Sequence, residues 1–181
     1  ILFQLFIGIG FVFCTLVMMM QLHFLLNTRE LGIERHNVGA VVYCSENIPF
    51  KEIVSQIPEV SECLNGFHTP IPKMFYSIYR VKEWDGKVAD SEQYIELEDE
   101  TINQDYADFF GVEVLNGSML DEKDGKDMVV INEAAMKAFG WTQPIGKKMG
   151  KLGKQCIVKG VIKNISYNAP IHPVAPAMFH L

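Results

Sequence analysis

The chain opens with a long run of apolar residues that carries no charge. Residues 1–26 contain no Asp, Glu, Lys or Arg, and only isolated polar or small residues such as Gln4, Gly8 and Thr15 interrupt the run. An α-helix rises about 1.5 Å per residue, so about 20 apolar residues cross the ~30 Å hydrocarbon core of a bilayer. The pattern predicts a transmembrane helix over 1–26. Because no charged flank precedes Ile1, we expect the span to begin at or before this residue.

Two other interpretations of residues 1–26 stay open. A signal peptide has an apolar stretch of only about 7–15 residues, followed by a cleavage site between small residues, and no such site follows here. A helix that is apolar on every face can also lie buried inside a large protein. The length of the run favours the membrane span over both.

A charged segment follows the apolar run and leads into the rest of the chain. Residues 27–36 form the predicted stalk and joint. Gly32 can end a helix, because glycine readily adopts the left-handed conformation that closes a helix C-terminus. We therefore predict that the membrane helix continues as a short stalk to about Leu31, and that Leu31 and Gly32 form the joint between the stalk and the following domain.

Beyond the stalk, apolar residues change to strand and short-helix periodicities. Runs that are β-branched, aromatic or alternating predict strands at 38–44, 73–81, 92–98, 112–120, 128–131, 155–166 and 177–181. Spacings of three and four predict helices at 50–65, 104–111 and 132–140, and Pro58 is expected to break or kink the first of them. Asp85-Gly86 predicts a hairpin turn, and Asn132 and Gly140 predict the two ends of the last helix. Strands mixed with a few short helices indicate an α+β domain.

Composition narrows the class of protein. The chain has 16 basic and 22 acidic residues, a formal net charge of −6 and 49% hydrophobic residues. This balance excludes a disordered chain and argues against a basic nucleic-acid binder. Four cysteines in 181 residues are too few for a disulfide-dense miniprotein. The sequence is therefore read as one membrane segment followed by an acidic folded domain at 37–181.

Motifs for catalysis, cofactors and metals are weak or missing in the sequence. The histidines have neither i, i+4 spacing nor an H-E-x-x-H motif. The lysines of the loop at 146–154 lie among glycines, but without a Walker A arrangement. The acidic loop at 121–127 has Lys123 at the third position of an EF-hand alignment, where an acid is needed. The sequence therefore predicts no catalytic, cofactor-binding or metal residue, and a protein that is not an enzyme.

The cysteines leave one question open. Cys14 lies in the predicted span, and no C-x-x-C motif occurs. If the domain lies outside the cytoplasm, Cys44 and Cys63 could form a disulfide. The alternative is that Cys44, Cys63 and Cys156 are three free buried thiols.

Four segments, taken in order, resemble one family. They are QLHFLLNTRELGIERHNV (21–38), YADFFGVEVLNGSML (106–120), VVINEAAMKAFGWTQPIGKKM (129–149) and CIVKGVIKN (156–164). Together they resemble the MacB-like periplasmic core domain of FtsX/MacB-type ABC transporter permeases. Ser118 departs from the arginine usual in that family, and Lys159 precedes Gly160 in the last segment.

The resemblance implies a fold and a function. The domain would be a two-lobed mixed α/β unit between the first and second membrane helices, periplasmic over 27–181 and anchored in the bacterial inner membrane. Lobe one is expected at 37–98 plus 155–181, and an inserted lobe at 99–154. ATP would be hydrolysed by a separate or fused cytoplasmic ABC ATPase. The permease would form a homodimer or a paired permease and would bind no nucleic acid, and a periplasmic partner is left open.

The implied activity is mechanical. A helix continuous from the span into a stalk transmits a displacement rigidly, because its hydrogen bonds are internal. The permease would thus couple ATP hydrolysis by its partner to an extracytoplasmic conformational change and to substrate export. The alternative function is a single-pass, membrane-anchored extracytoplasmic sensor or ligand-binding domain.

Overall fold

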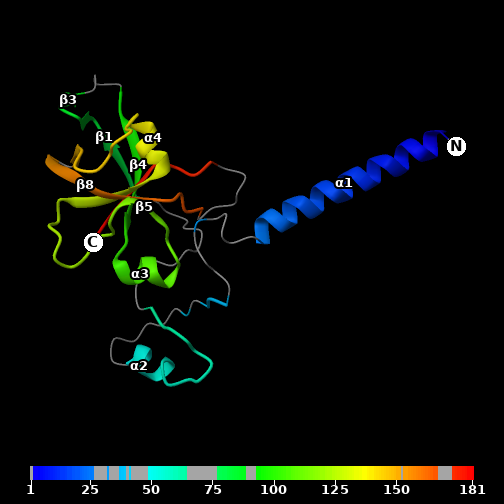
Figure 1. Ribbon diagram of the computed structural model, residues 1–181, viewed down its shortest axis with the longest axis horizontal. Helices are drawn as coiled ribbons and strands as arrows, with labels where there is room; N and C mark the ends of the chain where they lie inside the picture. Colours follow the sequence, from blue (N-terminus) through cyan, green and yellow to red (C-terminus); the bar gives the residue numbers. More distant parts are fainter. Residues whose placement is uncertain are drawn as a thin grey trace.

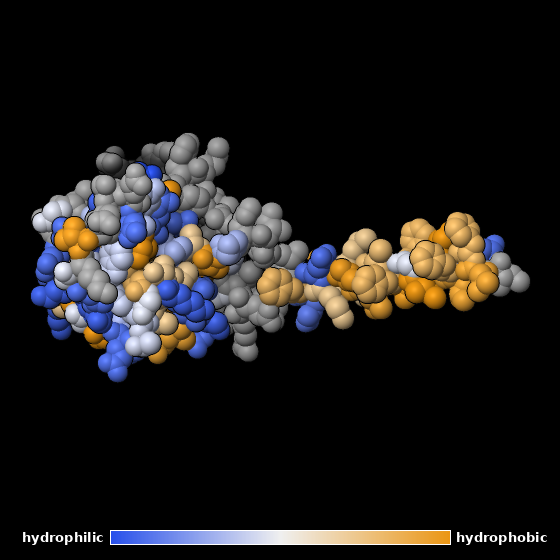
Figure 2. Space-filling model, turned by 90° about the horizontal axis from the view of Figure 1, so that it is seen from above, coloured by the Kyte–Doolittle hydropathy of each residue, from blue (hydrophilic) through white to orange (hydrophobic). Residues whose placement is uncertain are grey.

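A computed structural model describes residues 2–26, 32, 37–39, 41, 49–64, 77–88, 93–151, 153–166 and 173–181. The longest element is the helix α1, Leu2–Leu26, of 25 residues. Figure 1 shows α1 standing apart from the sheet, and Figure 2 shows that apolar residues cover it. Within α1, Leu2–Phe24 is long and apolar enough to cross a membrane, and none of it is buried. The helix is therefore not a core element of this domain.

The folded domain is built on one mixed sheet. Its strands are β1 (Ser77–Val81), β2 (Glu83–Trp84), β3 (Lys87–Val88), β4 (Ile95–Thr101), β5 (Val114–Gly117), β6 (Met128–Asn132), β7 (Lys148–Lys151), β8 (Lys154–Ile162) and β9 (Ala177–His180). The hydrogen-bonded order is β1-β4-β9-β6-β8-β7-β2-β3, and β5 pairs with β8. The pairs β4–β9 and β6–β8 are parallel, and the other ladders are antiparallel. With its short helices, this sheet confirms the α+β class.

Each face of the sheet carries its own apolar core. On one face, Val130 of β6 and Phe179 of β9 pack with Tyr106 and Ala107 of α3, Gln104–Phe109. On the other face, Ile131 and Met178 pack with Ala135 of α4, Glu133–Ala138. Successive side chains of a strand point to opposite faces, so neighbouring residues of β6 and β9 serve the two cores. The sheet is thus the middle layer between α3 and α4 (Figure 1).

Most of the elements predicted beyond residue 76 are present. The turn at Asp85-Gly86 has positive φ at both residues, +54° and +71°, and joins β2 to β3. β1 and β4 pair antiparallel across this hairpin, as expected of the strands at 73–81 and 92–98. Asn132 caps α4 by accepting a hydrogen bond from the backbone N–H of Ala135. Gly140 follows α4 with φ +67°.

The helix predicted over 50–65 is wrong in length. The structure has a five-residue helix α2, Phe50–Val54, followed by turns through Glu59. Pro58 lacks a backbone N–H, and its ring clashes with the carbonyl four residues earlier, which is that of Val54. The apolar spacing of Ile53 and Ile57 fits a helix, but the proline stops it.

Some predictions fall on residues outside the described ranges. The strand predicted over 38–44 is not present at the described residues 38, 39 and 41, and its other residues, 40 and 42–44, which include Cys44, lie outside the described ranges, as does Leu31. Strands from both predicted lobes share the single sheet, since β6 pairs with β8 and with β9. The lobe boundaries stay a prediction.

Candidate functional site

Gly32, half of the predicted joint, lies against the end of the longest strand. It is buried and has φ +80°. A Cβ built on Gly32 would overlap the carbonyl oxygen of Asn164 and would lie 3.3 Å from the Cα of Ile165. Both residues come just after β8, and Ile165 belongs to the core that contains α3. The chain that enters the domain therefore touches the sheet where β8 ends, and only glycine fits there.

Asn164 also connects this contact to α4. Its side-chain Oδ1 accepts a hydrogen bond from the backbone N–H of Ala134, 3.0 Å away. Its own backbone N–H donates to the carboxylate of Glu133 at 3.2 Å. Glu133 and Ala134 form the first turn of α4, where backbone N–H groups lack partners inside the helix. The residue that packs on Gly32 thus holds the start of a helix about 30 positions earlier in the chain.

Asn132, at the other end of this connection, is the buried polar residue of the described core, with 2% of its surface exposed. Its Oδ1 accepts from the N–H of Ala135 at 2.8 Å and from that of Ala177 at 3.0 Å. Its Nδ2 donates to the carbonyl of Ala175 at 2.8 Å. A buried amide is tolerated when its donors and acceptors are paired. Asn132 therefore ties α4 to the chain that leads into β9.

A second site brings together two of the segments that carried the resemblance. Gly117 at the end of β5 pairs with Gly160 of β8. A Cβ on Gly117 would overlap the carbonyl oxygen of Lys159, and one on Gly160 would overlap that of Ser118. The two strands approach so closely that side chains at these positions would collide. This close approach places Ser118 and Lys159, the two positions singled out in the resemblance, side by side.

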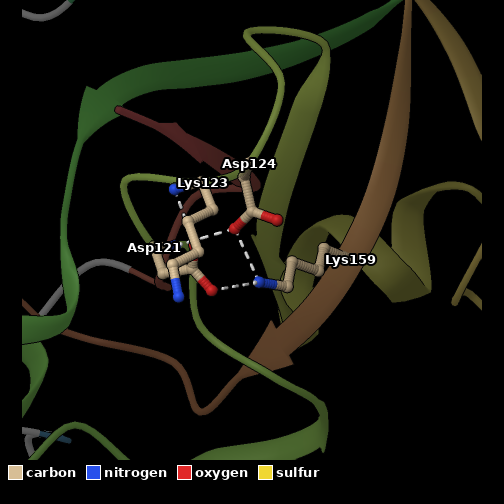
Figure 3. Close-up of polar contacts among 4 residues, drawn as sticks. All are labelled: Asp121, Lys123, Asp124 and Lys159. Carbon is tan, nitrogen blue, oxygen red and sulfur yellow. Dashed lines mark hydrogen bonds and ion pairs between the residues drawn. The ribbon is translucent and has the colours of Figure 1, made fainter.

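Lys159 forms an ion-pair cluster with the acidic loop at 121–127 (Figure 3). Its Nζ lies 2.6 Å from Oδ2 of Asp124 and 3.5 Å from Oδ2 of Asp121. The loop is also tied internally, because the N–H of Asp121 donates to the Asp124 carboxylate and that of Lys123 donates to the Asp121 carboxylate. These contacts attach the loop to β8. Asp121 and Asp124 are bound to Lys159, whereas a calcium-binding loop would need such carboxylates as metal ligands.

The cluster shifts the protonation of its members. The hydrogen bond from Lys159, followed by the one from the backbone of Asp121, lowers the pKa of Asp124 below its ordinary value. The hydrogen bond to Asp124 in turn raises the pKa of Lys159. Both shifts favour the charged pair. The role of this ion pair is structural, because each charge is already paired with the other.

The lysine-rich loop is partly neutralised in the same way. Lys147 Nζ lies 2.9 Å from Oδ1 of Asp85, and the indole Nε1 of Trp141 donates to Oδ2 of Asp85 at 2.7 Å. The ring of Trp141 stacks on Phe139 with centroids 4.2 Å apart. Asp85 thus fastens the β2–β3 hairpin to the loop that follows α4. Lys147, near the start of the lysine-rich loop at 146–154, is therefore held in an ion pair with Asp85.

The described residues hold no group of three or more His, Cys, Asp and Glu side chains that could bind a metal ion. Within the same ranges, His180 Nδ1 lies 3.0 Å from Oδ1 of Asp99, on the neighbouring parallel strand. This pair attracts by charge only when the imidazole is protonated.

The sequence interpretation named Gly32 but missed its partners. Asn132 was singled out only as a helix cap, and Asn164 only as part of a resemblance. An Asn-Glu pair at a strand end marks the cap locally. Its bonds to residues 43 and 45 positions away have no local signal.

Comparison with known proteins gives a structural likeness. No protein-family profile and no curated protein match the chain. The fold is similar to a domain of a protein described as a permease from Porphyromonas gingivalis, with 16% identity, a TM-score of 0.43, and 58% of this chain and 46% of the other covered.

Two further solved structures are similar. The periplasmic region of MacB from Actinobacillus actinomycetemcomitans has 19% identity and a TM-score of 0.40, covering 60% of this chain and 49% of the other. The extracellular domain of the noncanonic ABC-type transporter YknZ from Gram-positive bacteria has 25% identity and a TM-score of 0.36, covering 57% and 52%. The match thus spans about half of each of these chains.

Proposed function

We propose that the chain is the membrane-anchored extracytoplasmic domain of an FtsX/MacB-type ABC transporter permease. In this proposal α1 crosses the bacterial inner membrane and residues 27–181 lie in the periplasm. A cytoplasmic ABC ATPase supplies the energy, and the permease works as a homodimer or paired permease. The domain itself catalyses no reaction. The four ordered segments of the resemblance support the family, and the unburied apolar helix supports the anchor.

One observation carries the mechanical part of the proposal. Gly32 is packed against Asn164 so closely that no side chain fits between them. A force arriving along the stalk therefore meets the sheet at the end of β8, with no soft side chain in between. Interiors are close-packed and transmit such displacements. Leu31 and Gly32 form the proposed joint at which helix movement becomes domain movement.

The test inserts two glycines after Glu30, which interrupts the proposed stalk ahead of the proposed joint. The control inserts two glycines after Gly153, an exposed turn residue between β7 and β8. The full-length permease is reconstituted with its ATPase. A spin label at Val88, which is 73% exposed, reports the distance between the two domains of the dimer.

We expect ATP to change the spin-label distance in the wild type and in the control, but not in the variant with the insertion after Glu30, while ATP hydrolysis continues in all three. An ATP-driven distance change that survives the insertion would contradict coupling through the stalk. Reporter fusions test the placement separately, because a cytoplasmic location for residues 37–181 would remove the permease proposal as a whole.

A further inference from the structure

Asn132 and Asn164 link three parts of the chain that are far apart in the sequence. Gly32 packs against Asn164, both asparagines bind the first turn of α4, and Asn132 also binds Ala175 and Ala177, where the chain runs into β9. We infer that Asn132 and Asn164 are positioning residues that clamp Gly32 and the start of β9 to the start of α4. We call this pair the asparagine clamp.

The hydrogen-bond pattern separates the asparagine clamp from ordinary helix capping. Asn103 caps α3 with one side-chain bond, from the N–H of Tyr106. Asn132 makes the equivalent bond to Ala135 and adds two bonds to the segment that leads into β9. A cap needs only the first of these. The two additional bonds have no capping role, and they tie β6 to a segment more than 40 residues later.

The sheet register explains why these two asparagines can do this. Asn132 at the end of β6 lies beside Ile162 of the parallel strand β8. β9 runs along the other edge of β6, with Ile131 opposite Met178. The end of β6 is therefore flanked by β8, which leads to Asn164, and by β9. Hydrogen bonds at this point can connect both neighbouring strands.

The asparagine clamp deepens the proposed function and rests on it for its use. In a domain displaced through Gly32, the movement passes from Asn164 to the first turn of α4 and from there, through Asn132, to Ala175 and Ala177. Gly32 and the start of β9 then move together. Without the asparagine clamp, Gly32 could shift while β9 stayed in place.

The test measures amide hydrogen exchange at single-residue resolution in the full-length protein in lipid nanodiscs, without nucleotide or substrate. Net hydrogen-bond energies correspond to roughly three- to tenfold in exchange through local opening. We expect Asn132→Ala to speed exchange at both Ala135 and Ala177 by that factor. The matched variant Asn103→Ala should speed exchange at Tyr106 and leave Ala177 unchanged.

A second set of variants tests transmission, which a purely structural role would not produce. Gly32→Ala perturbs the contact between residue 32 and Asn164. We expect it to raise hydrogen exchange at the Ala177 amide about threefold. In the Asn164→Ala background, adding Gly32→Ala should leave Ala177 unchanged. If Gly32→Ala does not fold, Ile165→Val makes a milder change at the same contact.

The asparagine clamp is overturned if exchange at Ala177 does not change in Gly32→Ala or Ile165→Val. It is also overturned if exchange changes equally with and without the Asn164 side chain. The measurement needs no ATP. Its failure is therefore distinct from failure of the proposed function, which is judged by the glycine insertion after Glu30.

Discussion

The carbonyl oxygen of Asn164 occupies the space in which a side chain at residue 32 would have to lie. This relationship makes Gly32 necessary for two separate reasons, its positive φ and its contact. Gly117, which has φ +72° and faces the carbonyl oxygen of Lys159, meets both requirements as well. Gly140 meets only the first, because it has φ +67° but a Cβ there would meet no atom within 4 Å. A comparison of substitutions at Gly32 and Gly140 therefore distinguishes the cost of backbone strain from the cost of a steric clash.

Gly140→Ala should lower the free energy of unfolding by about 1–2 kcal/mol, the cost of a left-handed alanine. Gly32→Ala should lower it by about 2–5 kcal/mol, because displacement of close-packed backbone is added. Chemical unfolding followed by the fluorescence of Trp84 and Trp141 measures both. Equal losses would mean that the chain at residue 32 moves aside freely.

Asn132→Ala should destabilise the domain more than Asn103→Ala does. Loss of the cap alone costs about 1 kcal/mol, which is the expectation for Asn103. At Asn132 the substitution also leaves the carbonyl of the half-buried Ala175 and the buried N–H of Ala177 without their partners, so we expect about 2–4 kcal/mol. Asn132→Ser, which can still cap the helix, should recover only the capping part. Full recovery by serine would show that the bonds to Ala175 and Ala177 contribute little.

The ion pair of Lys159 and Asp124 gives the stability of the domain a defined pH dependence. The pKa of Asp124 is lowered by folding, so its contribution is present above the ordinary carboxyl pKa of about 4 and is lost as pH falls through the folded pKa. The pKa of Lys159 is raised, so its contribution is present below about 10 and is lost as pH rises through the folded pKa.

Asp124→Asn should therefore cost about 1 kcal/mol between roughly pH 5 and 10, and progressively less at both extremes. Glu113→Gln is the control, because its partner Lys163 lies at 3.0 Å in a pair that is largely exposed, and such pairs contribute little. Unfolding curves over this pH range check the shape. A loss that stays constant down to pH 2 would mean that Asp124 acts through packing instead of charge.

Asp85 should be important for the hairpin because it combines a turn and two side-chain contacts. Asp85→Ala removes the acceptor of Trp141 and places alanine at φ +54°, so we expect a loss of about 2 kcal/mol and a changed near-ultraviolet circular dichroism of the tryptophans. Asp85→Asn keeps a residue that tolerates this φ and can still accept from the indole, so the loss should be smaller. If the two variants behave alike, neither the turn nor the indole bond stabilises the hairpin.

The parts of the fold that could be predicted are those with a local signal. Asn132 and Gly140 bracket α4, and Asp85-Gly86 sets the hairpin, because caps and turns depend on residues within four positions. The break expected at Pro58 has the same local origin, since proline acts on the carbonyl four residues before it, and α2 ends at Val54. Only the continuation of this helix to residue 65 was wrong, because the spacing of Ile53 and Ile57 was given too much weight.

The partners at the joint had no such signal. Gly32 was recognisable as a helix-ending residue, but nothing near it in the sequence points to Asn164, 132 positions later. The bond between Lys159 and Asp124 likewise joins a strand to a loop 35 positions away. Such contacts depend on the order of strands in the sheet, which short-range patterns do not determine.

That strand order also decides when the domain can be completed. β9 follows the other described strands in the sequence, yet it lies between β4 and β6 and joins the β1–β4 pair to the rest of the described sheet. During synthesis, β1 emerges about 100 residues before the strand that will hold it. Until then one apolar face lacks Phe179 and the other lacks Met178. A growing chain therefore carries unfinished sheet edges, and addition of β9 is a late, long-range step of the kind that makes folding slow.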